Sequence, residues 1–212
     1  MKKIFLLFLF ISSRIASQTT DSLKTINSTL HPTPRILIIN SFDAETMHYR
    51  KNKKELFKNL TDSLQFLLTE QIKTENLGEP IIIPQLIPSI FDSKALLDSL
   101  FLTYNAGYAI VIKQLNAFFE QTNVEVSRDD FDGNKKREAS YDICSEVNYA
   151  FYKPNDKPYH SKTRICDPFT TRNVVSGLLA GGPDIVGKSK HAFKIIEKNA
   201  KDYVWEIGYR LK

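Results

Sequence analysis

Short apolar runs and helically spaced apolar residues follow one another along the first half of the chain. The run RILIIN at 35–40 predicts a buried strand. The segment 80–88, bounded by prolines, predicts a short edge strand, and 93–104 predicts an amphipathic helix. A longer amphipathic helix is predicted between 53 and 72 from apolar residues at helical spacing: Leu56, Leu60, Leu64, Leu67, Leu68 and Ile72. This order of elements predicts helices packed on a sheet.

From residue 108 onward, apolar and polar residues alternate as they do in long strands. Three strands are predicted at 108–127, 139–152 and 159–169, and the turn KPNDKP joins the last two. The middle strand has Ile143, Val147, Tyr149 and Phe151 on one face and Asp142, Cys144, Glu146 and Asn148 on the other. The tail reads as two helices separated by GGPD. The predicted fold class is therefore α/β (α+β), a mixed sheet with an antiparallel meander at its C-terminal half, flanked by amphipathic helices.

The turn between the last two predicted strands determines how their residues pair. A three-residue loop at 154–156 places Cys144 opposite Cys166 and Glu146 opposite Arg164. In an oxidising compartment, two cysteines that face each other across strands can form a disulfide. A register shifted by one residue would instead leave two free thiols. Both alternatives remain open from the sequence.

The first 34 residues differ in character from the remainder. Lys2 and Lys3, the apolar run at 4–11 and the small residue Ser17 predict a cleaved secretory signal peptide at 1–17, and a buried N-terminal element is the alternative. The run is too short to span a bilayer, and no later run approaches the ~20 apolar residues that a transmembrane helix needs. Residues 18–34 are polar and end in two prolines, which predicts a tether before a single α/β domain at 35–212.

Most of the excess positive charge lies in the predicted signal peptide. Removal of Lys2, Lys3 and Arg14 lowers the formal charge from +5 to +2. A nearly neutral domain gives no electrostatic reason to expect nucleic acid as a partner. The export signal predicts a soluble periplasmic or secreted protein, and no cysteine near the cleavage site predicts a lipid anchor.

The loop at 40–54 carries the densest set of charged and titratable side chains. Open α/β sheets bind ligands beyond the carboxyl ends of their strands, where this loop is expected. The candidate binding residues are Asp43, Glu45, His48, Arg50, Lys51, Lys53 and Lys54. The basic residues could face an anionic envelope component or an acidic protein, or simply reach solvent. Asp43 and His48, with Ser41 as nucleophile, would suit a hydrolase, whereas an ordinary solvated loop is the alternative.

The segment GGPDIVGKSK matches the spelling of a phosphate-binding P-loop through Gly182, Gly187, Lys188 and Ser189. A true P-loop follows a buried strand and precedes further strands, whereas the 23 residues after Ser189 all have a helical pattern. We interpret the match as chance and the segment as a turn between helices, with Asp184 as a candidate N-cap. Two cysteines with only His160 nearby do not make up a zinc site, so neither a metal nor a cofactor is predicted.

The order of these elements follows a known layout. An export signal and a tether precede a strand like RILIIN and an amphipathic helix; the strand YAIVI, a meander containing SYDICSEVNYAFY and a terminal helix follow. Over residues 35–210 this layout resembles the periplasmic α/β domain of the TolB amino-terminal type, shared by curli-secretion lipoproteins and penicillin-binding-protein activators. The resemblance implies an exported cell-envelope accessory or binding protein without catalytic activity, acting through protein or envelope-polymer contacts. The alternative hypothesis is a periplasmic hydrolase that uses the 40–54 loop.

Overall fold

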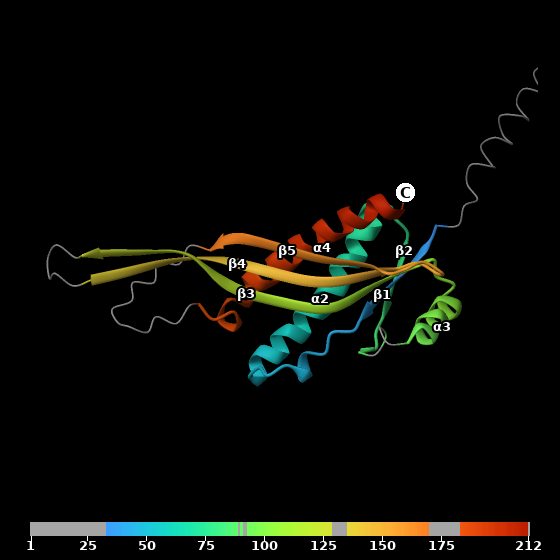
Figure 1. Cartoon of the computed structure of the whole chain (residues 1–212), viewed down its shortest axis with the longest axis horizontal. Coiled ribbons are helices and arrows are strands. Elements are labelled where there is room, and N and C mark those ends of the chain that lie inside the picture. Colours follow the sequence, from blue (N-terminus) through green and yellow to red (C-terminus); the bar gives the residue numbers. More distant parts are fainter. Residues whose placement is uncertain (1–32, 89, 91–92, 129–134, 170–182, 212) are drawn as a thin grey trace, which may run out of the picture. The chain divides into compact units, whose positions relative to one another are not determined.

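Five strands form one mixed sheet in the order β2–β1–β3–β4–β5 (Figure 1). The computed structural model describes residues 33–88, 90, 93–128, 135–169 and 183–211. Strand β1 (Arg35–Asn40) pairs in parallel with β2 (Glu79–Ile83) and with β3 (Tyr108–Arg128). Strands β4 (Lys135–Tyr152) and β5 (Tyr159–Phe169) continue the sheet in antiparallel pairing. The predicted α/β fold class and the C-terminal meander are confirmed.

Helices cover the two faces of the sheet unequally. Helices α2 (Lys51–Thr74) and α4 (Ser189–Leu211) pack together and share one core with the sheet. The shorter α3 (Lys94–Tyr104) packs on the other face, where it covers β1 and the first residues of β3. Two single 3₁₀ turns, η1 (Ala44–Thr46) and η2 (Val186–Lys188), precede α2 and α4. The predicted helices at 53–72 and 93–104 and the terminal helix therefore form.

The larger core contains a network of buried polar side chains between α4 and the strands. Asn199 accepts a hydrogen bond from the hydroxyl of Tyr149 at 3.0 Å and donates to the carbonyl of Thr163 at 3.0 Å and to the Ser145 hydroxyl at 3.2 Å. The rings of Tyr149 and Tyr203 stack with centroids 3.7 Å apart. Since all five residues are buried, these bonds fix the position of α4 on β4 and β5.

Strand β3 contains an irregularity that the sequence pattern does not reveal. The pairing of β3 with β4 skips one residue between Ile112 and Gln114, so Lys113 is an extra residue in the strand. Because the bulge resets the alternation, Leu115 and Ala117 lie in the same core as Ile112. Beyond the end of β5, β3 and β4 continue as a two-stranded ribbon as far as the pair Arg128–Lys135 (Figure 1).

Several predictions fall outside the described residues. These are the signal peptide at 1–17, nearly all of the tether at 18–34, most of the loop at 129–136, and the first of the two C-terminal helices with Gly182. The chain from Pro34 onward forms one compact unit. Within the described ranges, no helix is long and apolar enough to cross a membrane.

Candidate functional site

Polar side chains in the first half of the 40–54 loop hold the loop's own structure. Asp43 accepts a hydrogen bond from the backbone N–H of Glu45 at 2.9 Å, at the start of η1. The ammonium of Lys54 donates to the carbonyl of Glu45 and lies 3.6 Å from its carboxylate. Ser41 is buried, and its hydroxyl donates to the carbonyl of Pro88 at 3.1 Å. Each of these groups thus has a structural partner.

The groups proposed for a hydrolase line different hollows. Asp43 and Glu45 line a pocket of about 280 Å³ beside the middle of α2. His48 lines a different hollow, at the start of α2. Nucleophilic catalysis needs the nucleophile, the base and the group that orients the base to lie within hydrogen-bond reach of one another. Among the described residues, no hydrogen bond joins Ser41, Asp43 and His48, and the side chains of Ser41 and Asp43 bond to the backbone instead.

Four of the seven candidate residues do share one hollow, which we call the loop groove. It has a volume of about 660 Å³ and lies between the start of α2 and the residues just before α4. Its lining is His48, Tyr49, Arg50, Lys51, Asn52, Lys53, Asp184 and Val186. The groove thus joins two segments far apart in the sequence, whereas Asp43, Glu45 and Lys54 lie outside it.

The electrostatics of the loop groove favour an anion. No side chain caps α2, whose N-cap residue is Arg50, and the first turn contains no acidic residue. Cations at a helix N-terminus oppose the helix dipole by ~0.3–1 kcal/mol each, so Arg50, Lys51 and Lys53 gain from a nearby negative charge. Lys53 lies over the ring of Tyr49, 3.9 Å from its centroid, and Tyr49 packs against Phe57. These contacts hold Lys53 at the groove.

A second hollow lies between α3 and the turn that joins β4 to β5, and we call it the α3 pocket. Its volume is about 450 Å³, within the usual range of small-molecule sites. Three separate segments line it: Ile90, Lys94, Leu97, Asp98 and Phe101 in and before α3; Lys113 in β3; and Tyr152, Lys153, Pro154, Asn155, Asp156, Lys157, Pro158 and His160 around the turn. The sequence predicted the turn but not its position beside α3, because that position depends on the order of the strands.

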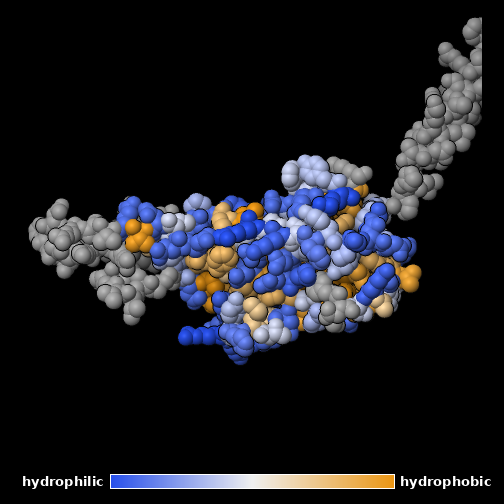
Figure 2. All heavy atoms as spheres, viewed as in Figure 1, coloured by the Kyte–Doolittle hydropathy of each residue, from blue (hydrophilic) through white to orange (hydrophobic). Residues whose placement is uncertain are grey.

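The face of β3, β4 and β5 opposite α2 and α4 carries the disulfide. The pairing of β4 with β5 places Cys144 opposite Cys166 and Glu146 opposite Arg164, which confirms the predicted register. The two cysteines form a disulfide with their Cα atoms 4.1 Å apart, close to the spacing of a non-hydrogen-bonded antiparallel pair. Figure 2 shows that mainly hydrophilic side chains cover the middle of these strands in this view.

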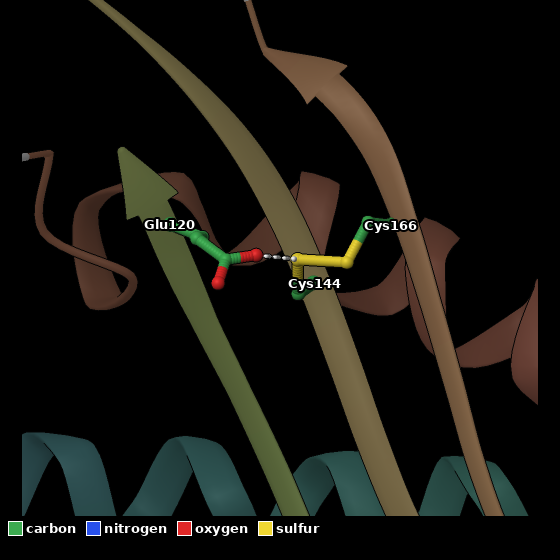
Figure 3. A group of neighbouring side chains, drawn as sticks. All are labelled: Glu120, Cys144 and Cys166. Carbon is green, nitrogen blue, oxygen red and sulfur yellow. Dashed lines mark hydrogen bonds between the residues drawn. A yellow bond between two sulfur atoms is a disulfide. The ribbon is translucent and has the colours of Figure 1, made fainter. Parts of the chain in front are cut away.

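Glu120 of β3 points toward the disulfide (Figure 3). Its carboxylate lies 3.8 Å from the Cys144 sulfur and accepts a hydrogen bond from Arg164 at 2.5 Å. This bond raises the pKa of the Arg164 guanidinium above its ordinary value. Glu146 pairs with Lys162 at 2.9 Å, so the ion pairs run to diagonal neighbours and not between the residues directly opposite each other. Glu120 and the cysteines have the spacing of metal ligands, but the disulfide removes the thiolates that a metal would need.

The described part of the P-loop-like segment forms a helix start. Gly187 and Lys188 belong to η2, and Ser189 begins α4. Asp184 accepts a hydrogen bond from the N–H of Val186 at 3.2 Å, close to its predicted capping role. Residues 189–211 form one helix, so this described stretch contains no strand to supply the acidic residue of a nucleotide site.

Comparisons with known proteins give similarities of overall structure only. No protein-family model and no curated protein matches the sequence. A minor lipoprotein from Acinetobacter baumannii aligns at 7% identity with a TM-score of 0.41, over 84% of this chain and 94% of that one. Rare lipoprotein B from Shewanella oneidensis aligns at 10% identity with a TM-score of 0.36, over 83% of this chain and 91% of that one. A neuraminyllactose-binding hemagglutinin homolog from Helicobacter pylori aligns at 12% identity with a TM-score of 0.41, over 85% of this chain and 88% of that one.

Similarities of this degree assign neither a family nor a function to the chain. Two of the three structures are described as lipoproteins. None of the three is described as a TolB, curli-secretion or penicillin-binding-protein-activator protein, so that specific resemblance stays a prediction.

Proposed function

We propose that the chain is an exported, non-catalytic binding protein of the cell envelope, and that the loop groove contacts an anionic envelope component. In this proposal residues 1–17 direct export, 18–34 form a tether, and 35–212 act as one α/β binding domain. The ligand chemistry is a phosphate or carboxylate group, carried by a lipid headgroup or by a cell-wall polymer. An acidic protein partner would present similar charges and is a separate outcome of the test below.

The observation that carries the proposal is the set of cationic side chains around one hollow. These are Arg50, Lys51 and Lys53; His48 also lines the groove, and Asp184 is the acidic residue among the lining that the structure describes. The carboxylate of Asp184 accepts a hydrogen bond from the backbone N–H of Val186, so part of its capacity to accept hydrogen bonds is already used. An anion in the groove would contact the cations and would also interact favourably with the N-terminus of α2.

Co-sedimentation tests the proposal with defined surfaces. The probes are vesicles of phosphatidylethanolamine alone, the same vesicles with phosphatidylglycerol, and isolated cell-wall sacculi. We expect binding to at least one anionic surface and weaker binding at high salt, because exposed charges are screened. The double variant Arg50→Gln/Lys51→Gln should bind that surface about fivefold more weakly or worse, from two exposed charge contacts.

The matched control is Lys190→Gln/Lys194→Gln, which removes the same charge from exposed positions on α4. It should bind as the wild type does. Equal binding by both double variants would show that net charge, and not the groove, attracts the surface, and would contradict the proposal. Binding to neither lipid nor sacculi, with capture of an acidic envelope protein instead, would also overturn the assignment of the ligand.

A further inference from the structure

The α3 pocket combines an apolar floor with a basic rim. Its floor is formed by Ile90, Leu97 and Phe101, which are 2%, 5% and 7% exposed, together with part of Tyr152. These residues belong to the smaller core, on the α3 side of the sheet. Since the volume of about 450 Å³ adjoins this core, a ligand that enters the pocket meets an apolar surface.

The rim of the pocket is dominated by lysines. Lys94, Lys113, Lys153 and Lys157 line it, with His160 beside them. The opposing acidic residues of the lining are Asp98 and Asp156. Asp156 lies 3.6 Å from the Lys153 ammonium and offsets its charge, and Asp98 offsets one more, so the four lysines leave a formal excess of two positive charges. The rim thus keeps an excess of positive charge.

The turn that carries part of this rim has a fixed backbone. The N–H of Asp156 donates to the carbonyl of Lys153 at 3.1 Å, and Asn155 has a φ of 66°. Proline followed by a residue with positive φ is typical of a type II turn, with Pro154 and Asn155 at its centre. A rigid turn holds Lys153 and Lys157 on one side of the pocket without further loss of backbone freedom on binding.

We propose that the α3 pocket binds a small anionic amphiphile, with its carboxylate or phosphate head at the lysines and its apolar tail on the floor. Lysine ammonium groups suit a carboxylate or phosphate head. Burial raises the pKa of Tyr152, so its hydroxyl stays protonated and remains a donor to such a head. The pocket lies on the α3 side of the sheet, in a different part of the chain from the loop groove, so this proposal does not depend on the proposed function.

Fluorescence titration with anilinonaphthalene sulfonate, an aromatic anion, provides the first measurement on the purified protein. Decanoate, decanol and inorganic phosphate are then added as competitors that carry the head and tail together, the tail alone and the head alone. Decanoate should displace the probe at a concentration about tenfold below either of the others, because it alone uses both parts of the pocket. Competition by lysophosphatidic acid, compared with decanoate, distinguishes a phosphate head from a carboxylate head.

Three variants separate the roles of the rim. Lys153→Gln/Lys157→Gln should weaken decanoate binding about fivefold or more, from two partly exposed charges, and leave decanol binding unchanged. Asp98→Asn should strengthen decanoate binding about twofold, because it removes an opposing charge. Lys190→Gln/Lys194→Gln on α4 changes the net charge equally and should have no effect. Circular dichroism and a urea titration of each variant confirm that it is folded.

Two results would overturn the proposal. The first is displacement of the probe by decanol as effectively as by decanoate, which would mean that the lysines do not recognise a head group. The second is equal binding of decanoate by the Lys153/Lys157 and Lys190/Lys194 variants. Arg50→Gln/Lys51→Gln should leave decanoate binding intact, so failure at the loop groove and failure at the α3 pocket are separately visible.

Discussion

Substitution of Asn199 by alanine should strongly destabilise the larger core. The side chain makes three buried hydrogen bonds, to the Tyr149 hydroxyl, the Thr163 carbonyl and the Ser145 hydroxyl. Ser145 also donates to the carbonyl of Ile195 at 3.3 Å and so keeps a partner in the variant. Tyr149 and Thr163 each lose a partner for a buried group, at about 1–3 kcal/mol each. With a small cavity added, we expect a loss of about 3–5 kcal/mol in the free energy of unfolding.

Urea unfolding followed by circular dichroism measures this loss by linear extrapolation. Asn59→Ala is the matched control, because Asn59 is exposed on α2 and its change should cost less than about 1 kcal/mol. Tyr149→Phe keeps the ring that stacks on Tyr203 and removes only the hydroxyl. In a double-mutant cycle, Tyr149 and Asn199 should show a coupling energy of about 1–2 kcal/mol. If Asn199→Ala costs no more than Asn59→Ala, the network does not hold α4 on the sheet and the reasoning is refuted.

Two further predictions concern the disulfide and the buried tyrosines. The double variant Cys144→Ala/Cys166→Ala should lower the free energy of unfolding by about 3 kcal/mol, because the disulfide closes a loop between cysteines 22 residues apart. In the unreduced wild-type protein, neither cysteine should react with iodoacetamide. Alkylation of both cysteines would contradict the disulfide. Burial raises the pKa of Tyr149 and of Tyr203 well above the ordinary value, so the folded state retains protons that the unfolded state loses. Stability should therefore be complete below about pH 10 and fall above it, by up to ~1.4 kcal/mol per pH unit for each tyrosine. In urea titrations at increasing pH, the free energy of unfolding should fall less steeply for Tyr149→Phe than for the control Tyr209→Phe, since Tyr209 is exposed. Equal slopes would contradict the claim that burial of Tyr149 causes the pH dependence.

The sequence predicted those parts of the fold that depend on local pattern. Alternation in 139–152 identified the buried face, and the length of the turn at 154–156 determined the register that pairs Cys144 with Cys166. The bulge at Lys113 was not predicted, because an extra residue in a strand leaves the apolar content almost unchanged. The diagonal ion pair of Arg164 with Glu120 was also missed, since it spans β4 and depends on the order of three strands.

Less of the candidate sites than of the fold could be predicted from the sequence. The 40–54 loop could be recognised as one continuous charged segment, and four of its seven candidate residues do line a common groove. Asp43 bonds locally as the N-cap of η1, whereas the bond from Lys54 to the Glu45 carbonyl was not predictable, because it depends on how the loop folds back on α2. The α3 pocket draws on three segments between residues 90 and 160; the helix and the turn were predicted, but nothing in the sequence indicates that they meet. A site of this kind appears only when the strand order brings its segments together.

The two faces of the sheet differ in a way that explains where a ligand pocket can form. On one face, α2 and α4, with 24 and 23 residues, bury long aliphatic and aromatic side chains together with the Asn199 network. On the other face, α3 has only 11 residues and ends at Asn105, which is in the left-handed conformation. There the sheet contributes Ala109 and Ala150 beside larger residues such as Leu37 and Ile39, and the β4–β5 turn borders the space beside the helix. Since the larger apolar core lies on the face of α2 and α4, an open pocket beside α3 leaves that core intact.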